Sequence, residues 1–338
     1  MAGDYHVFEI ENLTLQRGIT LPRAELAYKT YGQLADDKSN VILYPTSYAA
    51  QHYDTEWLIG PGRVLDPTDW FIVVPNMFTN GLSSSPSNLA APFGPDRYPL
   101  FTHWDNVHAQ ERLLRELFGI ERIALAYGWS MGAQQVLHWG AIFPERVDRI
   151  CAVCGSARTS IHNKVFLEGV RATLTGDPSW RGDHFSEHPV RGLRAMGRVY
   201  AGWAMSQAFY RERLFEHAGF SSLEDFLVRS WEANFLRRDA HDLLASLETW
   251  MASDISDNSI YQGDLSRALG AITARTVVMP SRTDLYFTPE DSEMETAQMP
   301  NATFRPIESI WGHRAGNPIL NPDDETVLRQ AVADLLAD

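Results

Sequence analysis

Gly128-Trp-Ser-Met-Gly132 is the stretch that decides the fold, because of what stands on either side of it. The apolar run Arg122–Ala126 before it is typical of a buried strand, and Met131–Phe143 after it follows a helical period. Glycines on both sides of the serine allow a tight turn and a close approach of helix to sheet. The stretch therefore predicts a strand, a sharp turn and a helix, with Ser130 exposed at the turn.

The same alternation continues outward from this turn. Short apolar runs typical of buried strands lie at Val41–Tyr44, Trp70–Val74, Arg149–Cys154, Arg275–Met279 and Ala302–Ile307. Helical periods cover residues 108–118 and 324–336, and residues 6–32 have the pattern of a β-hairpin or meander. Strands and helices that alternate in this way predict an α/β protein with a mostly parallel sheet flanked by helices. A G-x-S-x-G turn in that setting is typical of the α/β-hydrolase fold.

One long segment breaks the alternation. Between residues 160 and 267, Trp, Leu and charged residues recur at helical spacing, and no clear strand pattern occurs. We therefore predict an α/β-hydrolase core made of residues 1–160 and 268–338. Residues 161–267 would form a helical lid inserted into it.

Composition excludes several classes of protein. The 338 residues include 29 Lys and Arg against 43 Asp and Glu, for a net charge of −14. Such an acidic chain is a poor partner for nucleic acid or an anionic membrane surface. No run of about eighteen apolar residues occurs and the first residues do not resemble a secretory signal, so we expect a cytoplasmic enzyme.

Ser130 needs a base and an acid to become a nucleophile. In this fold the chain order is serine, acid, histidine. Asp284 and His313 each follow a predicted strand downstream of Ser130. His313 would take the Ser130 proton and Asp284 would orient the imidazole. His138 is the main competitor for the base, but it lies about 12 Å further along the predicted helix.

The oxyanion of the reaction needs two donors. The Met131 amide at the start of the helix is one candidate, and the Ser47 amide in the turn after Val41–Tyr44 is the other. Tyr48 is the second choice in that turn. Tyr48 and Trp129 are also expected to contact the substrate, a small-molecule ester.

No metal or cofactor is predicted. The two cysteines, Cys151 and Cys154, have a spacing that metal and redox sites use, but no second pair completes a zinc site. Side chains three apart on a strand point to opposite faces, so the two thiols are not expected to meet.

Several motifs resemble homoserine O-acetyltransferases. They are the elbow with Gln135, His138-Trp139 and Phe143–Val147 behind it, and Ile59–Asp66 followed by Trp70–Asn76. The resemblance implies an α/β-hydrolase core, a helical lid, acyl-serine chemistry and often a homodimer. It also implies the triad Ser130, Asp284 and His313.

The sequence departs from that family where an amino acid would bind. The family has an aspartate after the catalytic histidine, suited to the substrate's amino group, and here Arg314 stands there. Arg198 matches a lid arginine near the substrate carboxylate, but Met205 replaces the tyrosine seven residues later.

With these departures, the sequence is more similar to the family members that hydrolyse acetic esters. We therefore predict a serine hydrolase that cleaves short-chain acetic esters. The alternatives are an acyl-CoA-dependent O-acetyltransferase acting on homoserine or another small alcohol, and a non-catalytic binding protein.

Overall fold

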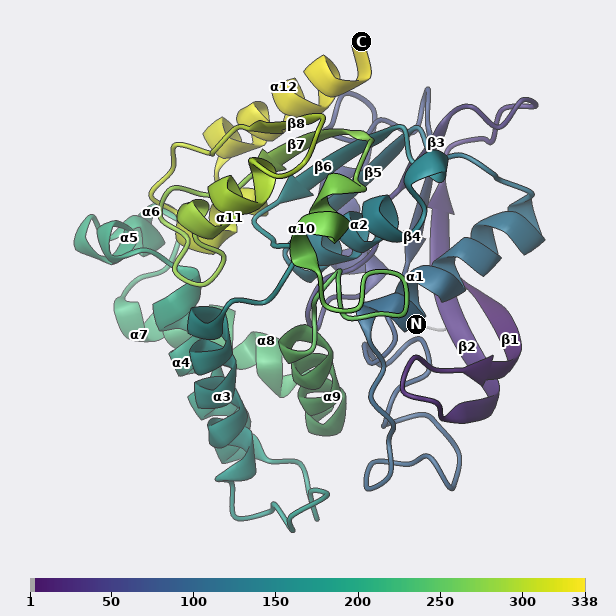
Figure 1. Ribbon diagram of the computed structural model, residues 1–338. Coiled ribbons are helices and arrows are strands. Elements are labelled where there is room, and N and C mark those ends of the chain that lie inside the picture. Colours follow the sequence, from purple (N-terminus) through teal and green to yellow (C-terminus); the bar gives the residue numbers. More distant parts are fainter. Residues whose placement is uncertain (1–3, 338) are drawn as a thin grey trace.

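The computed structural model describes residues 4–337, and residues 1–3 and 338 lie outside the described part. An eight-stranded sheet forms its centre (Figure 1), in the order β1-β2-β4-β3-β5-β6-β7-β8. The strands are β1 (His6–Thr14), β2 (Thr20–Tyr31), β3 (Val41–Leu43), β4 (Phe71–Pro75), β5 (Leu125–Trp129), β6 (Arg149–Val153), β7 (Arg275–Met279) and β8 (Ala302–Phe304). β1 and β2 pair antiparallel, as do β2 and β4, and all other pairs are parallel. The predicted α/β-hydrolase architecture is confirmed.

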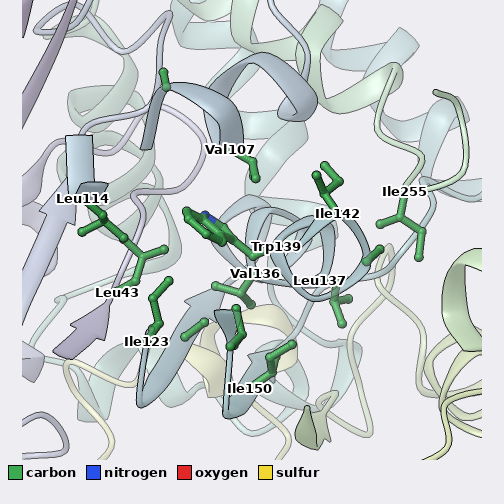
Figure 2. Packing of buried hydrophobic residues seen from close by; sticks show 14 of the residues in the cluster. Leu43, Val107, Leu114, Ile123, Val136, Leu137, Trp139, Ile142, Ile150 and Ile255 are labelled. Carbon is green, nitrogen blue, oxygen red and sulfur yellow. The ribbon is translucent and has the colours of Figure 1, made fainter. Parts of the chain in front are cut away.

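Both faces of the sheet are covered by helices. The helices of the core are α1 (His103–Arg112), α2 (Met131–Ile142), α10 (Leu265–Gly270), α11 (Pro289–Thr296) and α12 (Pro322–Ala337). Successive residues of β3 alternate between two buried clusters, with Val41 and Leu43 in one and Ile42 in the other. Figure 2 shows the first cluster, to which α2 contributes Val136 and Trp139. The second contains the inner face of α12.

The strand before the nucleophile differs from the prediction. It was expected at Arg122–Ala126 and runs from Leu125 to Trp129, because its ladder pairs Ala126–Trp129 with Ile150–Val153 of β6. Apolar character alone did not predict these bounds, because Gly128 and Trp129 of the G-x-S-x-G motif form the end of the strand.

A series of helices separates β6 from β7. Between β6 and β7 lie α3 (Ile161–Thr175), α4 (Val190–Ala204), α5 (Gln207–Arg211), α6 (Leu214–His217), α7 (Leu223–Phe226), α8 (Ala233–Leu236) and α9 (Ala240–Met251). A π-helical turn, Leu227–Glu232, joins α7 to α8. Figure 1 shows these helices gathered at one end of the sheet. They share an aromatic-rich cluster that includes Phe166, Tyr200 and Trp250.

Two chain segments meet where this helical cap leaves and rejoins the core. Thr159 N donates to Ser253 O at 2.9 Å and Ile255 N donates to Ala157 O at 3.0 Å. Arg158 and Asp254 form an ion pair at 2.9 Å. We call residues 157–159 and 253–255 the neck.

The chain returns to the core earlier than the predicted boundary at residue 267. Ile255, Tyr261 and the inner face of α10 belong to the core cluster rather than to the cap cluster. The packing therefore supports a cap of about residues 161–251. Sequence periodicity missed this because α10 is itself a helix and continues the helical pattern.

Candidate active site

Ser130 sits in a strained turn between β5 and α2. Its backbone has φ 58° and ψ −127°, a conformation that residues other than glycine rarely adopt. A Cβ atom on Gly128 would lie 2.2 Å from the Gly132 carbonyl oxygen, and one on Gly132 would lie 2.7 Å from the Pro45 oxygen. The Ser130 amide donates to Val153 O at 2.9 Å, so the turn is fixed to β6. Only glycine permits this turn on both sides of the serine.

Asp284 and His313 meet after strands β7 and β8. Asp284 Oδ2 lies 2.6 Å from His313 Nδ1, and both side chains are almost fully buried. The other carboxylate oxygen accepts hydrogen bonds from the amides of Tyr286 and Phe287, each at 3.1 Å. Asp284 is thus held from behind by its own turn, and it leaves Nε2 of His313 as the ring nitrogen available for proton transfer.

Aromatic rings hold the imidazole in place. The His313 ring centroid lies 5.0 Å from that of Trp129, 4.5 Å from Tyr286 and 5.6 Å from Phe287. Ser130 and His313 line the same cavity. No hydrogen bond joins the Ser130 hydroxyl to His313 within residues 4–337, and such contacts commonly tighten only when substrate binds.

The two predicted oxyanion donors lie beside the nucleophile. Met131 is the first residue of α2, and the first amides of a helix have no acceptor within it. The Ser47 hydroxyl donates to the Trp129 carbonyl at 2.5 Å, which fastens the turn after β3 to the serine turn. The Ser47 amide donates to no other described residue, so it is free to bind a ligand atom.

The cavity above these residues has a volume of about 280 Å³. This is near the lower end of the range for ligand pockets, which supports a small substrate. Core residues and cap residues both line it, including Ser47, Tyr48 and Trp129 from the core and Met205, Phe209 and Trp231 from the cap. Tyr48 also donates its hydroxyl to Leu243 O of the cap at 3.1 Å.

Arg198 does not reach this cavity, contrary to the predicted substrate contact. Its guanidinium contacts Glu232 at 2.6 Å and also pairs with Glu224, and it is not among the lining residues. Two carboxylates already neutralise it on the outer side of the cap. Met205, at the position where the resembling family has tyrosine, does line the cavity.

His138 is a structural residue, as the sequence indicated. It is buried in the core, its Nδ1 lies 2.8 Å from Gln134 O, and its ring packs against His103. Burial lowers the pKa of His138 to about 4, so the imidazole stays neutral. It is not among the residues that line the cavity.

The positions of the two cysteines differ from the prediction. Cys151 and Cys154 lie in the same buried cluster, because Cys154 follows the end of β6 and has φ 46°. They remain free thiols. The Sγ of Cys154 comes within 4.8 Å of ligand atoms of Asp284 and His313, a proximity that strand periodicity could not predict.

Four charged residues that no sequence motif brings together also line the cavity. They are Asp54, Arg237, Arg238 and Arg314. Asp54 pairs with Arg237 at 2.9 Å and with Arg238 at 2.5 Å across more than 180 residues of chain. No local pattern could have shown a contact of such long range.

The chain is similar to known proteins over most of its length. Residues 56–309 match the family described as alpha/beta hydrolase fold, and the chain belongs to that family. It is 37% identical over 314 residues to the ethyl acetate hydrolase of Pseudomonas veronii, covering 92% of this chain and 89% of that one. A solved acetylester hydrolase from Corynebacterium glutamicum has 33% identity and a TM-score of 0.96, covering 99% of this chain and 97% of that chain. A homoserine O-succinyltransferase of Methylibium petroleiphilum is 32% identical over 341 residues, covering 90% and 87%. The predicted kinship with acetic ester hydrolases, and more distantly with homoserine acyltransferases, is confirmed.

Of the residues described, no helix combines the length and the apolar character that a membrane span requires.

Proposed function

We propose that this protein is a serine carboxylic ester hydrolase that cleaves short-chain acetic esters through an acyl-Ser130 intermediate. The observation that carries the proposal is the Asp284–His313 pair, at 2.6 Å, in the wall of the cavity that also exposes the strained Ser130. The small volume of that cavity and the ethyl acetate hydrolase relative support acetic esters as the substrate class.

The first half of the reaction forms the acyl-enzyme. Ser130 Oγ attacks the ester carbonyl while His313 takes its proton. The amides of Met131 and Ser47 donate to the developing oxyanion. As the bond between the carbonyl carbon and the alcohol oxygen breaks, His313 gives the proton to the departing alcohol, and acetyl-Ser130 remains.

The second half releases acetate. Water gives a proton to His313 and attacks the acetyl carbon, and the proton then returns to Ser130 as acetate leaves. Asp284 stabilises the imidazolium in both halves. Since its carboxylate already accepts two backbone amides, it can hold the ring without turning away.

The acetyltransferase alternative has weaker support from the cavity. Binding homoserine would need a carboxylate near its ammonium group. Directly after His313, where the resembling family has an aspartate for this purpose, Arg314 lines the cavity instead. Met205 provides no hydroxyl for the other end of an amino acid, and Arg198 is paired outside the cavity.

Acetate release tests this proposal. Purified enzyme is supplied with ethyl acetate, p-nitrophenyl acetate or acetyl-CoA, each with and without millimolar homoserine. We expect steady acetate release from both esters, no acceleration by homoserine and no O-acetylhomoserine. Faster formation of O-acetylhomoserine than of free acetate would contradict hydrolysis and support transfer.

We also propose a cytoplasmic location, from the sequence, and a homodimer, from the family resemblance. Cell fractionation tests the first, and size-exclusion chromatography with light scattering tests the second.

A further inference from the structure

The cavity has the opposite charge to the rest of the molecule. Three arginines and one aspartate line it, a net charge of +2, whereas the whole chain carries −14. Asp54 is the only carboxylate in the lining that the described residues provide. A neutral ester needs no such concentration of cations. The excess of positive charge therefore indicates a ligand that carries a negative charge.

Arg314 carries half of this excess. Asp54 contacts both Arg237 and Arg238 and leaves that cluster with a net charge of +1, whereas no carboxylate of residues 4–337 lies within ion-pairing distance of Arg314. Its guanidinium instead lies over the Trp129 ring, 5.8 Å from the centroid. The same ring packs against His313, which places Arg314 beside the reacting groups.

Partial burial makes this position costly. Arg314 is half-buried, and desolvation by the surrounding protein lowers its pKa, yet a guanidinium stays charged in proteins. Arg238 adds a second unused donor, since its Nε is buried and makes no hydrogen bond to any described residue. A partly buried charge without a direct ion-pair partner destabilises a protein, so an anionic group supplied by a ligand would relieve the cost.

We propose that the preferred substrates are acetic esters whose alcohol carries a carboxylate, and that Arg314 binds this carboxylate. The inference rests on the proposed function, in which the acyl group is acetyl and the charge must therefore be on the alcohol. Arg314 is then a specificity-determining residue. Hydrolysis itself is unchanged: water is consumed, and a hydroxycarboxylate, acetate and one proton are released.

Two matched esters test the charge. O-acetyl-lactate carries a carboxylate, and O-acetyl-lactamide has a neutral amide in its place. We expect the wild-type kcat/KM to be at least about tenfold higher for O-acetyl-lactate, the size of effect expected for a charge-assisted hydrogen bond. We expect Arg314→Gln to bring this ratio close to one and Arg314→Lys to restore part of it.

The control variant is Arg211→Gln. Arg211 is an exposed arginine of the cap outside the cavity, so its replacement changes the net charge equally. It should keep the wild-type ratio. Thermal unfolding of all variants verifies that they are folded, and the wild-type ratio should fall as salt is raised from 0.05 to 0.5 M.

The outcomes separate this inference from the proposed function. If p-nitrophenyl acetate is not hydrolysed, the proposed function fails. If it is hydrolysed but the wild-type ratio is near one, or Arg211→Gln lowers the ratio as much as Arg314→Gln, only this inference fails. Preferred cleavage of monoethyl succinate over O-acetyl-lactate would also overturn it, because the charge would then be on the acyl side.

Discussion

Ser130 has a backbone conformation that costs folding energy, with φ at 58°. The surrounding structure over-determines this conformation through a hydrogen bond to β6 and two glycines without room for a Cβ. Its hydroxyl is thereby held at the cavity, where the imidazole of His313 also lies. Strain at this one residue is a cost of placing the nucleophile.

Replacement of Ser130 by alanine removes the covalent path. We expect kcat for p-nitrophenyl acetate to fall on the order of 10⁴-fold or more. Labelling by a fluorophosphonate, followed by mass spectrometry of the peptide, should be lost in the same variant. Labelling at another serine in the variant would identify a different nucleophile.

The two buried histidines should differ in their effect on catalysis. His313→Ala should reduce kcat about as much as Ser130→Ala, because no other described histidine lines the cavity. His138→Ala should mainly lower thermal stability, because His138 packs in the core. Equal losses of kcat in two folded variants would mean that the base has been assigned wrongly.

Chelators should have no effect on activity. Cys154, Asp284 and His313 lie close together, but burial raises the pKa of Cys154 well above its usual value and keeps it a thiol. A thiol is a poor metal ligand, and Nδ1 of His313 is already bonded to Asp284. Acetate release is measured after dialysis against EDTA, and a loss that zinc restores would contradict this prediction.

The elbow between β5 and α2 depends on glycine for space. Gly128→Ala would place a Cβ atom 2.2 Å from the Gly132 carbonyl oxygen and 2.6 Å from the Ala133 nitrogen, both backbone atoms. Because neither can move without displacing α2, we expect a loss of several kcal/mol in the free energy of unfolding. Urea denaturation and acetate release measure it.

Gly169→Ala is the matched control for that substitution. Gly169 lies in α3, with nothing within 4 Å of its added Cβ. Alanine should stabilise this helix by up to about 1 kcal/mol. If the two variants have the same stability, steric exclusion is not what keeps glycine at position 128.

Elements were predictable where the signal is local. The periodicity of 131–143 and the apolar runs at 41–44 and 275–279 gave a helix and two strands at nearly their observed bounds. The motif and chain order also led to Asp284 and His313, which the structure joins by a hydrogen bond. Ends set by sheet pairing, as in β5, could not be read from apolar character.

Contacts between distant segments were not predictable in this way. The sequence shows that Arg198 is an arginine in the cap, but not that Glu224 and Glu232 neutralise it. Likewise, only the folded chain brings Asp54 to Arg238 and leaves Arg314 without an ion-pair partner among residues 4–337. The general chemistry follows from local motifs, whereas substrate charge depends on these long-range pairings.

At the scale of the whole molecule, one carboxyl group couples stability to pH. Glu295 of α11 is buried beside the neck, where it accepts hydrogen bonds from the amides of Ala157 at 2.7 Å and Arg158 at 3.1 Å. Burial raises its pKa to about 8. The unfolded chain releases this proton near the ordinary pKa of glutamate, whereas the folded protein keeps it to a higher pH. Because the folded state binds more protons in this pH range, the free energy of unfolding declines as pH rises toward 8.

We therefore expect the free energy of unfolding to fall by about 1 kcal/mol per pH unit between pH 6.5 and 8. Glu295→Gln removes the titrating group and should flatten this part of the profile. Urea denaturation of both proteins at several pH values measures the difference. Parallel profiles for the two proteins would show that Glu295 is ionised in the folded state throughout.

The neck has a consequence for how this protein could acquire new substrates. Because residues 157–159 and 253–255 bond to each other, the inserted helices begin and end at one point, between two neighbouring strands. A replacement of any length that restores those bonds leaves the register of the sheet intact. The catalytic residues and the part of the cavity wall that the cap supplies can therefore diverge separately, and grafting a relative's segment at the neck is a practical route to altered selectivity.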